Sequence, residues 1–198
     1  MKILQTASTL SWNIIYDNSQ NWIAITTSST GQYVYQAATS YLYASSNYGS
    51  SWNISYDNSQ NWIAITTSST GQYVYAATEN GEDNKGAYLY ASSNYGSSWN
   101  ITYDNSIYSS QNWAAITTSS TGQYVYAATN DNSVGAFLYA SSNYGSSWDV
   151  SYDSSQNWWA ITTSSTGQYV YAATNLGVLH ASSNYGSSWN INYDNSQN

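Results

Sequence analysis

Short runs of β-forming residues alternate along the chain with turns rich in Ser, Thr, Asn and Gly. Trp62–Thr67 alternates bulky and small side chains, while Gln72–Thr78, Ala87–Ala91 and Trp99–Tyr103 are rich in Tyr, Val, Thr and Ala. Alternation over roughly four to eight residues, with β-branched and aromatic enrichment, is typical of β-strands, and a helical period is absent. The pattern therefore predicts four strands in this stretch, joined by turns such as Ser68–Gly71.

The same four-strand pattern returns because the chain consists of one unit, copied. The block Ser-Ser-Asn-Tyr-Gly-Ser-Ser-Trp occurs four times without a change, starting at Ser45, Ser92, Ser141 and Ser182. A second block, Asn-Trp-x-Ala-Ile-Thr-Thr-Ser-Ser-Thr-Gly-Gln-Tyr-Val-Tyr, also occurs four times, and its tryptophans are Trp22, Trp62, Trp113 and Trp158. Successive tryptophans are 40, 51 and 45 residues apart, and the length differences fall in loops. Four short antiparallel strands per unit of about 40–50 residues are typical of a β-propeller blade.

We therefore expect an all-β fold, a single β-propeller domain over residues 1–198 with four-stranded antiparallel blades. Its four complete units cover about 21–57, 58–104, 105–153 and 154–198, and an N-terminal half-unit covers 1–20. Three closures are open: a four-bladed ring, a five-bladed ring with one incomplete blade, or one ring shared by two chains. Unpaired strand edges promote association, so we expect a homo-oligomer formed through the unpaired half-unit.

The repeated turn carries a resemblance to a known family. Ser45-x-Asn47-x-Gly49-x-Ser51-Trp52 resembles the Asp-box, or BNR repeat, whose pattern is Ser-x-Asp-x-Gly-x-Thr-Trp. Asn replaces Asp in every copy, and it keeps the acceptor oxygen that bonds turn amides, so the turn should form. We place Asn and Gly at the positions that need a left-handed backbone. The resemblance implies a sialidase-like propeller in which the box is structural and its Trp packs inside the blade.

Composition and charge remove several functions. The chain has 10 acidic residues against 2 lysines and no arginine, for a net charge of −8. Phosphate binding depends on Lys and Arg, so neither nucleic acid nor an anionic membrane surface is an expected partner. Sialidases of the resembled family hold the sugar carboxylate with three arginines, so that activity is excluded. No apolar run reaches the ~18 residues of a membrane helix, and the absence of cysteine excludes thiolate metal sites.

Candidate ligand-binding residues lie where each fourth strand leads into the next unit. In a propeller these loops share one face with the loops between second and third strands, opposite the Ser-Asn-Gly turns. The candidates are carboxylates, amides and indoles: Asp57, Asn61, Trp62, Asp104, Asn112, Trp113, Asp153, Asn157 and Trp158. Such groups bind sugars by hydrogen bonds to hydroxyls and by stacking on an aromatic ring. The simpler interpretation of each is turn chemistry for Asp-Asn-Ser and a core position for Trp.

These features predict a non-catalytic, lectin-like module that binds glycans, outside the cell or at its surface, although the N-terminus shows no clear signal peptide. The alternative is a structural, self-assembling repeat protein, such as a surface or fibre subunit or a designed repeat, with no small-molecule ligand. We expect no enzyme activity, cofactor or metal. The single histidine, His180, stands where other units have Tyr43, Tyr90 and Tyr139, and we expect a packed substitute for Tyr rather than a catalytic base.

Overall fold

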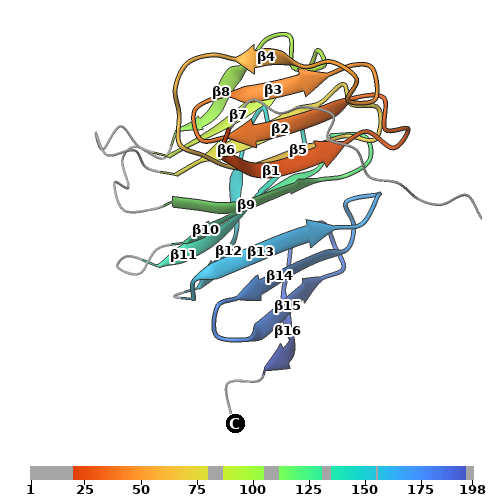
Figure 1. Cartoon of the computed structure of the whole chain (residues 1–198). Helices are drawn as coiled ribbons and strands as arrows, with labels where there is room; N and C mark the ends of the chain where they lie inside the picture. The colour runs from red at the N-terminus through yellow and green to blue at the C-terminus, as the bar shows by residue number, and fades with distance from the viewer. Residues whose placement is uncertain (1–19, 80–86, 105–111, 131–134, 155, 195–198) are drawn as a thin grey trace, which may run out of the picture.

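The part of the chain that the structure describes forms four four-stranded blades of a β-propeller. The computed structural model describes residues 20–79, 87–104, 112–130, 135–154 and 156–194, so the half-unit predicted over 1–20 lies, apart from Gln20, outside the described residues (Figure 1). All regular structure in these ranges is β, as predicted, and no helix there is long and apolar enough to cross a membrane.

Each copied unit forms one antiparallel sheet whose strands follow in chain order. Blade 1 contains β1 (Trp22–Thr27), β2 (Val34–Ala38), β3 (Leu42–Ser45) and β4 (Asn53–Tyr56). Blade 2 contains β5 (Trp62–Thr67), β6 (Val74–Thr78), β7 (Tyr88–Ser92) and β8 (Asn100–Asp104). Blade 3 contains β9 (Asn112–Thr118), β10 (Val125–Asn130), β11 (Ala136–Ser141) and β12 (Asp149–Ser154). Blade 4 contains β13 (Trp158–Thr163), β14 (Val170–Thr174), β15 (Val178–Ser182) and β16 (Asn190–Asp194).

The predicted strands agree with the observed ones to within two residues. The first predicted strand of blade 2 coincides with β5, whereas β6 begins two residues later than expected. The delay arises because the Tyr73 carbonyl oxygen accepts a hydrogen bond from the Ser68 amide and so belongs to the turn. The third strand runs on into Ser92, which still pairs with Val74.

The blades stand in an open row. Their first strands lie side by side, with β1 against β5, β5 against β9 and β9 against β13 (Figure 1). The two end strands, β1 and β13, share no such interface in the described structure. The row therefore has a free side at each end.

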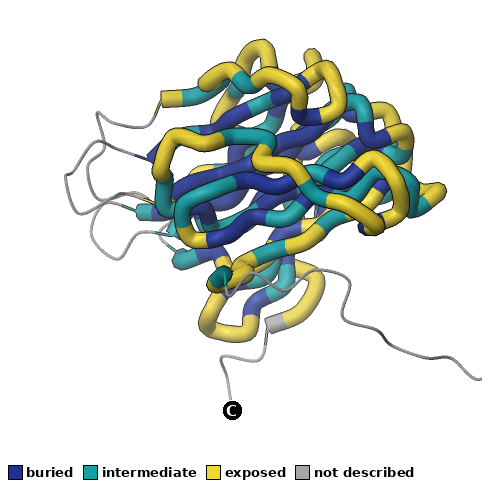
Figure 2. The backbone as a smooth tube through the Cα atoms, turned by 45° about the horizontal axis from the view of Figure 1, so that its top comes forward, coloured by how far each residue is buried: buried dark blue, intermediate teal, exposed yellow. Residues whose placement is uncertain are grey.

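Three hydrophobic clusters hold the row together, and each lies between two neighbouring blades. In β6, Val74 and Ala76 pack toward blade 1, whereas Tyr75 and Ala77 pack toward blade 3. The second strand of an inner blade is therefore buried on both faces, which explains its nearly continuous apolar run. Figure 2 shows the buried segments in the middle of the sheets and the exposed ones mainly at the turns and outer strands.

Two series of hydrogen bonds also cross the blade boundaries. Backbone amides donate at 2.8 Å from Ser29 to Ser69, from Ser69 to Ser120 and from Ser120 to Ser165. Second-strand tyrosine hydroxyls donate to glycine carbonyl oxygens of the next blade: Tyr35 to Gly71 at 2.7 Å, Tyr75 to Gly122 at 2.7 Å and Tyr126 to Gly167 at 2.8 Å. Each boundary thus repeats the same contacts.

Candidate functional site

The turn between the third and fourth strands of each blade is closed by its own side chains. In blade 1, Ser45 Oγ accepts a hydrogen bond from the Gly49 amide at 2.9 Å and donates to Asn47 Oδ1 at 2.9 Å. Asn47 Oδ1 also accepts from the Ser51 amide at 2.9 Å, and Asn47 Nδ2 donates to Ser51 Oγ at 2.8 Å. The expectation that Asn keeps this turn formed is confirmed. Because the asparagine's polar atoms are engaged within the turn, its role is structural.

Two successive residues of this turn, tyrosine and glycine, have a left-handed backbone, so the expectation is confirmed for glycine and wrong for asparagine. The four tyrosines have φ angles of 60°, 59°, 60° and 59° at Tyr48, Tyr95, Tyr144 and Tyr185. A bulky residue in this region is strained, at a cost of roughly 1–2 kcal/mol, and such strain often accompanies a functional role. Here it directs the tyrosine ring toward the preceding blade.

These rings meet a second tyrosine across each blade boundary. Tyr33 of blade 1 and Tyr95 of blade 2 have ring centroids 4.6 Å apart. The same contact recurs at 4.7 Å between Tyr73 and Tyr144 and at 4.6 Å between Tyr124 and Tyr185. Each pair lies at one end of a groove between two blades, so the grooves recur along the row.

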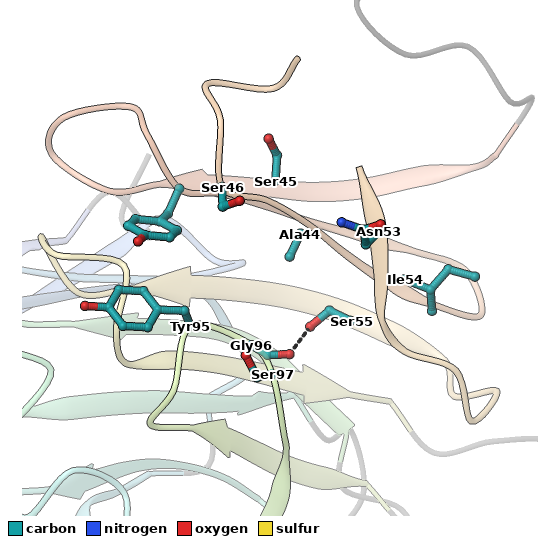
Figure 3. A pocket seen from close by; sticks show the side chains of 10 residues that line it. Ala44, Ser45, Ser46, Asn53, Ile54, Ser55, Tyr95, Gly96 and Ser97 are labelled. Carbon is teal, nitrogen blue, oxygen red and sulfur yellow. Dashed lines mark hydrogen bonds between the residues drawn. The ribbon is translucent and has the colours of Figure 1, made fainter. Parts of the chain in front are cut away.

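The groove between blades 1 and 2 is shown in Figure 3, and its cavity volume is about 290 Å³. Its lining comprises Tyr33, Ala44, Ser45, Ser46, Asn53, Ile54 and Ser55 of blade 1 and Tyr95, Gly96 and Ser97 of blade 2. Matching grooves of about 200 Å³ and about 290 Å³ lie between blades 2 and 3 and between blades 3 and 4. Hydroxyl groups dominate the lining of all three, and the described residues that line them include no lysine.

The floor of the first groove is fixed by Ser55. Its Oγ donates to the Gly96 carbonyl oxygen at 2.6 Å (Figure 3). The same Oγ accepts from Trp99 Nε1 at 2.9 Å. Ser151 makes the same two bonds, to Gly186 and from Trp189, in the third groove. Trp99 and Trp189 are therefore partly buried at a blade boundary, which corrects, for these two, the implication that the turn tryptophan packs inside its own blade.

The middle groove differs because a threonine replaces that serine. Thr102 directs its hydroxyl to the Leu89 carbonyl oxygen of its own blade at 3.4 Å. Trp148 Nε1 is consequently buried without a hydrogen-bond partner in the described structure. The three grooves thus share a frame but not every polar group.

The structure corrects the expectation that Trp62, Trp113 and Trp158 meet a ligand. These indoles are 3%, 0% and 0% exposed. Trp62, for example, packs edge-on to Tyr56 of the preceding blade at 5.4 Å and to Tyr90 of its own blade at 5.0 Å. An indole enclosed in this way cannot stack on a sugar, because its faces are covered by neighbouring rings.

The predicted carboxylates and amides lie one blade apart on the edge of the row where the fourth strands end. Asp57, Asp104 and Asp153 are exposed, whereas Asn61, Asn112 and Asn157 are partly buried. The asparagine backbone joins neighbouring loops: the carbonyl oxygens of Asn61 and Asn157 accept from the amides of Glu79 and Asn175. In the described ranges no three His, Asp or Glu side chains gather as metal ligands would.

His180 occupies the ring position that tyrosine fills in the other blades, which confirms the expected substitution. It pairs with Ala172 across the sheet, as Tyr90 pairs with Ala76. The side chain is buried, and its ring centroid lies 4.9 Å from that of Trp158. Neither ring nitrogen has a hydrogen-bond partner, and burial lowers the pKa of His180 below 6.5. The imidazole is a neutral packing group.

The grooves were missed because the sequence analysis assigned the turn wholly to structure. The available signal was the tyrosine between Asn and Gly in every copy, since an apolar ring serves no purpose in closing such a turn. The second half of each groove comes from the neighbouring unit, at Tyr33, Tyr73 and Tyr124. A pattern confined to one unit does not show which residues of the next unit it will meet.

Solved structures share this fold at low sequence identity. An ancestral GH74 enzyme aligns with a TM-score of 0.68 at 19% identity, over 91% of this chain and 27% of that one. The GH74 enzyme of Niastella koreensis aligns with a TM-score of 0.63 at 20% identity, over 85% and 24%. A chain of the nidogen/laminin complex aligns with a TM-score of 0.63 at 13% identity, over 83% and 60%.

This chain therefore spans less than two thirds of each of these structures. No model of a protein family matches the sequence, and no curated protein matches it significantly. At such identities the likeness establishes the β-propeller fold alone.

Proposed function

We propose that this β-propeller is a non-catalytic carbohydrate-binding or adhesive module, and that its inter-blade grooves hold the sugars. The observation that carries the proposal is the same hydroxyl-lined groove, with an exposed tyrosine ring, built three times along one row. Repetition of a weak site suits attachment to a surface that displays many copies of one ligand.

The groove chemistry matches a neutral sugar. In the first groove Ser46 and Ser97 are exposed hydroxyls, Asn53 supplies an amide, and Tyr95 supplies an exposed ring. Hydroxyls and amides bond sugar hydroxyls as both donor and acceptor, and a ring face packs against sugar C–H groups. Among the described residues that line the first groove there is no cation, and the chain carries a net charge of −8, so acidic glycans are disfavoured.

The size of the grooves sets the expected affinity. Volumes of about 200–290 Å³ lie at or below the lower end of the roughly 300–1,000 Å³ typical of small-molecule sites. Each groove therefore suits a single sugar ring bound weakly. Useful attachment then depends on several grooves engaging one multivalent partner.

Binding without catalysis is supported by the distribution of carboxylates. Glycoside hydrolysis commonly needs two carboxyl groups on either side of one bond. The third groove contains one carboxylate, Asp149, and the first two have Asn53 and Asn100 at that position. The likeness to GH74 enzymes, among them a xyloglucanase from Xanthomonas campestris, supports a glycan partner by analogy of fold.

We also propose that the four turns are Asp-box turns with asparagine in place of aspartate. In support, the side-chain oxygen of Asn47 accepts the amide that the family aspartate would accept. An extracellular or cell-surface location is proposed with this assignment, because glycans are displayed there.

The test is binding to an array of neutral glycans, followed by titration calorimetry on the best ligand. A triple variant, Tyr95→Gly, Tyr144→Gly and Tyr185→Gly, removes the three rings, and glycine tolerates the left-handed backbone. We expect binding to fall by about tenfold or more while circular dichroism and thermal unfolding still show a folded protein.

The matched control is the triple variant Asp57→Asn, Asp104→Asn and Asp153→Asn, which alters the opposite edge of the same blades. We expect this variant to bind as the wild type does. Loss of binding in the aspartate variant alone would contradict the groove assignment. No saturable binding to any glycan by the wild type would overturn the proposal.

A second function, a self-assembling subunit, is favoured by one separate observation, the exposed ends of the row. It is compatible with glycan binding but requires no ligand, and the contact it needs is argued next.

A further inference from the structure

The row of blades ends in two faces that other blades keep buried. The front face is the side of blade 1 turned away from blade 2, and Ile25 on it is 63% exposed, against 7%, 8% and 8% for Ile65, Ile116 and Ile161. The back face is the side of blade 4 turned away from blade 3, and Tyr171 on it is 40% exposed, against 1%, 0% and 1% for Tyr35, Tyr75 and Tyr126. Large apolar groups exposed in this way mark an interaction surface.

The two series of hydrogen bonds between blades stop at these faces with complementary groups. The amide series ends with the Ser165 N–H on the back face, while the Ser29 carbonyl oxygen on the front face accepts no bond in the described structure. The hydroxyl series ends with Tyr171, and the corresponding acceptor on the front face is the Gly31 carbonyl oxygen. The back face therefore carries two hydrogen-bond donors, and the front face carries the two corresponding acceptors.

The aromatic contacts stop in the same way. At the first inner boundary the rings of Tyr33 and Tyr95 pack with their centroids 4.6 Å apart. The equivalent residues at the ends of the row are Tyr169 on the back face and Tyr48 on the front face. Tyr169 and Tyr48 are both exposed. Likewise Tyr193 is exposed, although its counterpart Tyr56 packs on the Trp62 indole of the next blade.

We propose that the front face of a second copy of this chain docks on the back face, head to tail, with the contacts that join neighbouring blades. Ser165 then donates to Ser29 of the second copy, Tyr171 donates to Gly31, and Tyr169 packs on Tyr48. Because known propellers close with about 4–8 blades, two chains of four blades form the ring, which has eight. Each of the two front-to-back contacts in this ring is heterologous, and a two-fold axis relates one contact to the other.

Two other occupants fit these faces less well. Closure of one chain on itself would bring β1 to β13, and these strands do not meet in the structure. Residues 1–19 match only the third and fourth strands of a unit in sequence, so they lack the Ser-Ser-Thr-Gly turn and the Tyr-Val-Tyr strand. That segment therefore has no residues equivalent to Tyr169 and Tyr171, which the proposed contacts with Tyr48 and Gly31 require. A second copy of the chain supplies both tyrosines.

The end faces depart from the inner boundaries at several positions. Gln36 on the front face replaces an alanine, the residue at Ala76, Ala127 and Ala172. Gly177 on the back face replaces the alanine found at Ala87 and Ala136, which is buried. Also on the back face, Asn192 replaces the smaller residue found at Ser55, Thr102 and Ser151. The pairing of the end faces therefore differs in side-chain volume from the inner boundaries at these three positions.

The first test measures mass in solution by analytical ultracentrifugation over a range of concentrations, without sugar, so that its result is independent of the glycan proposal. We expect a dimer of the 21.8 kDa chain. Ile25→Glu on the front face should give monomer, whereas Ile101→Glu, which alters another exposed isoleucine on the outer strand β8, should leave the dimer intact. Tyr171→Phe should raise the dissociation constant by about tenfold.

Mixing variants tests the head-to-tail geometry. Ile25→Glu spoils only the front face and Tyr171→Glu only the back face, so neither should self-associate. Their mixture retains one intact pair of faces and should form a heterodimer. A dimer that mixing does not restore would indicate a two-fold symmetric patch and overturn the proposal.

A cross-link then identifies the residues in contact. The chain has no cysteine, so Ser29→Cys with Ser165→Cys introduces a single pair. Oxidation of this pair should give a covalent dimer. In the control, Ser69→Cys with Ser120→Cys, oxidation should instead cross-link two blades of the same chain. A monomeric wild type, or an internal cross-link from the first pair, would show that the chain closes on itself or covers its own ends, and would overturn the proposal.

Discussion

The hydroxyl of Tyr75 in blade 2 donates a 2.7 Å hydrogen bond to the carbonyl oxygen of Gly122 in blade 3, and both residues are buried. The bond joins the second strand of one blade to the first turn of the next. It recurs at the other two boundaries. This buried polar contact at a fixed place therefore helps to align one sheet on its neighbour, together with the backbone bond from Ser69 to Ser120 at the same boundary.

Removing this hydroxyl should destabilise the protein. Tyr75→Phe leaves the ring in place but leaves the buried Gly122 carbonyl oxygen unsatisfied, at a cost of roughly 1–3 kcal/mol. Urea unfolding measures the change. Tyr171→Phe is the control, because that hydroxyl is on the exposed back face; measured at a concentration where the chain is monomeric, it should change stability little. Equal losses from both variants would contradict the interpretation.

The same turn predicts a steric effect at Gly122. A Cβ atom there would lie 2.7 Å from the Cβ of Tyr73, and the φ angle is 82°. Gly122→Ala should therefore cost more than the roughly 1–2 kcal/mol of left-handed strain alone. Gly31→Ala, measured at a concentration where the chain is monomeric, is the matched control, with a φ of 76° and its nearest atom 4.0 Å away. The difference between the two unfolding free energies isolates the clash, and a difference near zero would rule it out.

Buried tyrosines make the fold sensitive to alkali. Burial, with a smaller contribution from neighbouring tyrosines, raises the pKa of Tyr35, Tyr75 and Tyr126 well above the usual 10.0. Unfolded chains lose these protons first, so the stability they contribute is complete below pH 10.0 and falls as pH rises above it. A phenolate absorbance titration should show Tyr35, Tyr75 and Tyr126 ionising only as circular dichroism reports unfolding. Complete ionisation of a folded protein would contradict this.

Lowering the pH should destabilise the folded protein through protonation of His180. Its pKa is lowered by burial, so the unfolded chain takes up the proton first, and stability is complete above pH 6.5 and falls as pH decreases below it. His180→Tyr restores the residue of the other blades and should remove this part of the pH dependence. The measurement is the urea midpoint of both proteins across the weakly acidic range. Parallel curves would show that other groups carry the effect.

The strands were predictable because each is a short segment bounded by turn residues. Trp62–Thr67 carries its alternation locally, and its limits need no knowledge of the neighbouring blade. Ser92 was assigned to the turn because its sequence is that of a turn, but pairing with Val74 extends the strand to it. Local pattern thus predicts the sheets, and ladder pairing corrects their ends.

The candidate site was harder because it depends on the angle between blades. The burial of Trp113 follows from the rings of Tyr103 and Tyr139, which belong to two different blades. Tyr95 becomes part of a groove only because Tyr33, from another unit, lies opposite. Sequence period gives the order of the units but not the rotation between them, so neither contact could be derived from it.

In the described ranges each blade makes its extensive contacts with the blade before it and the blade after it, so the folding free energy is close to a sum over units and their boundaries. In-frame loss of one whole unit would delete one boundary and join two compatible surfaces. Near-identical coding repeats are prone to such slippage. Length variants of this protein should therefore arise readily and fold, and selection would act on how many units a variant carries before it acted on the sequence of any one of them.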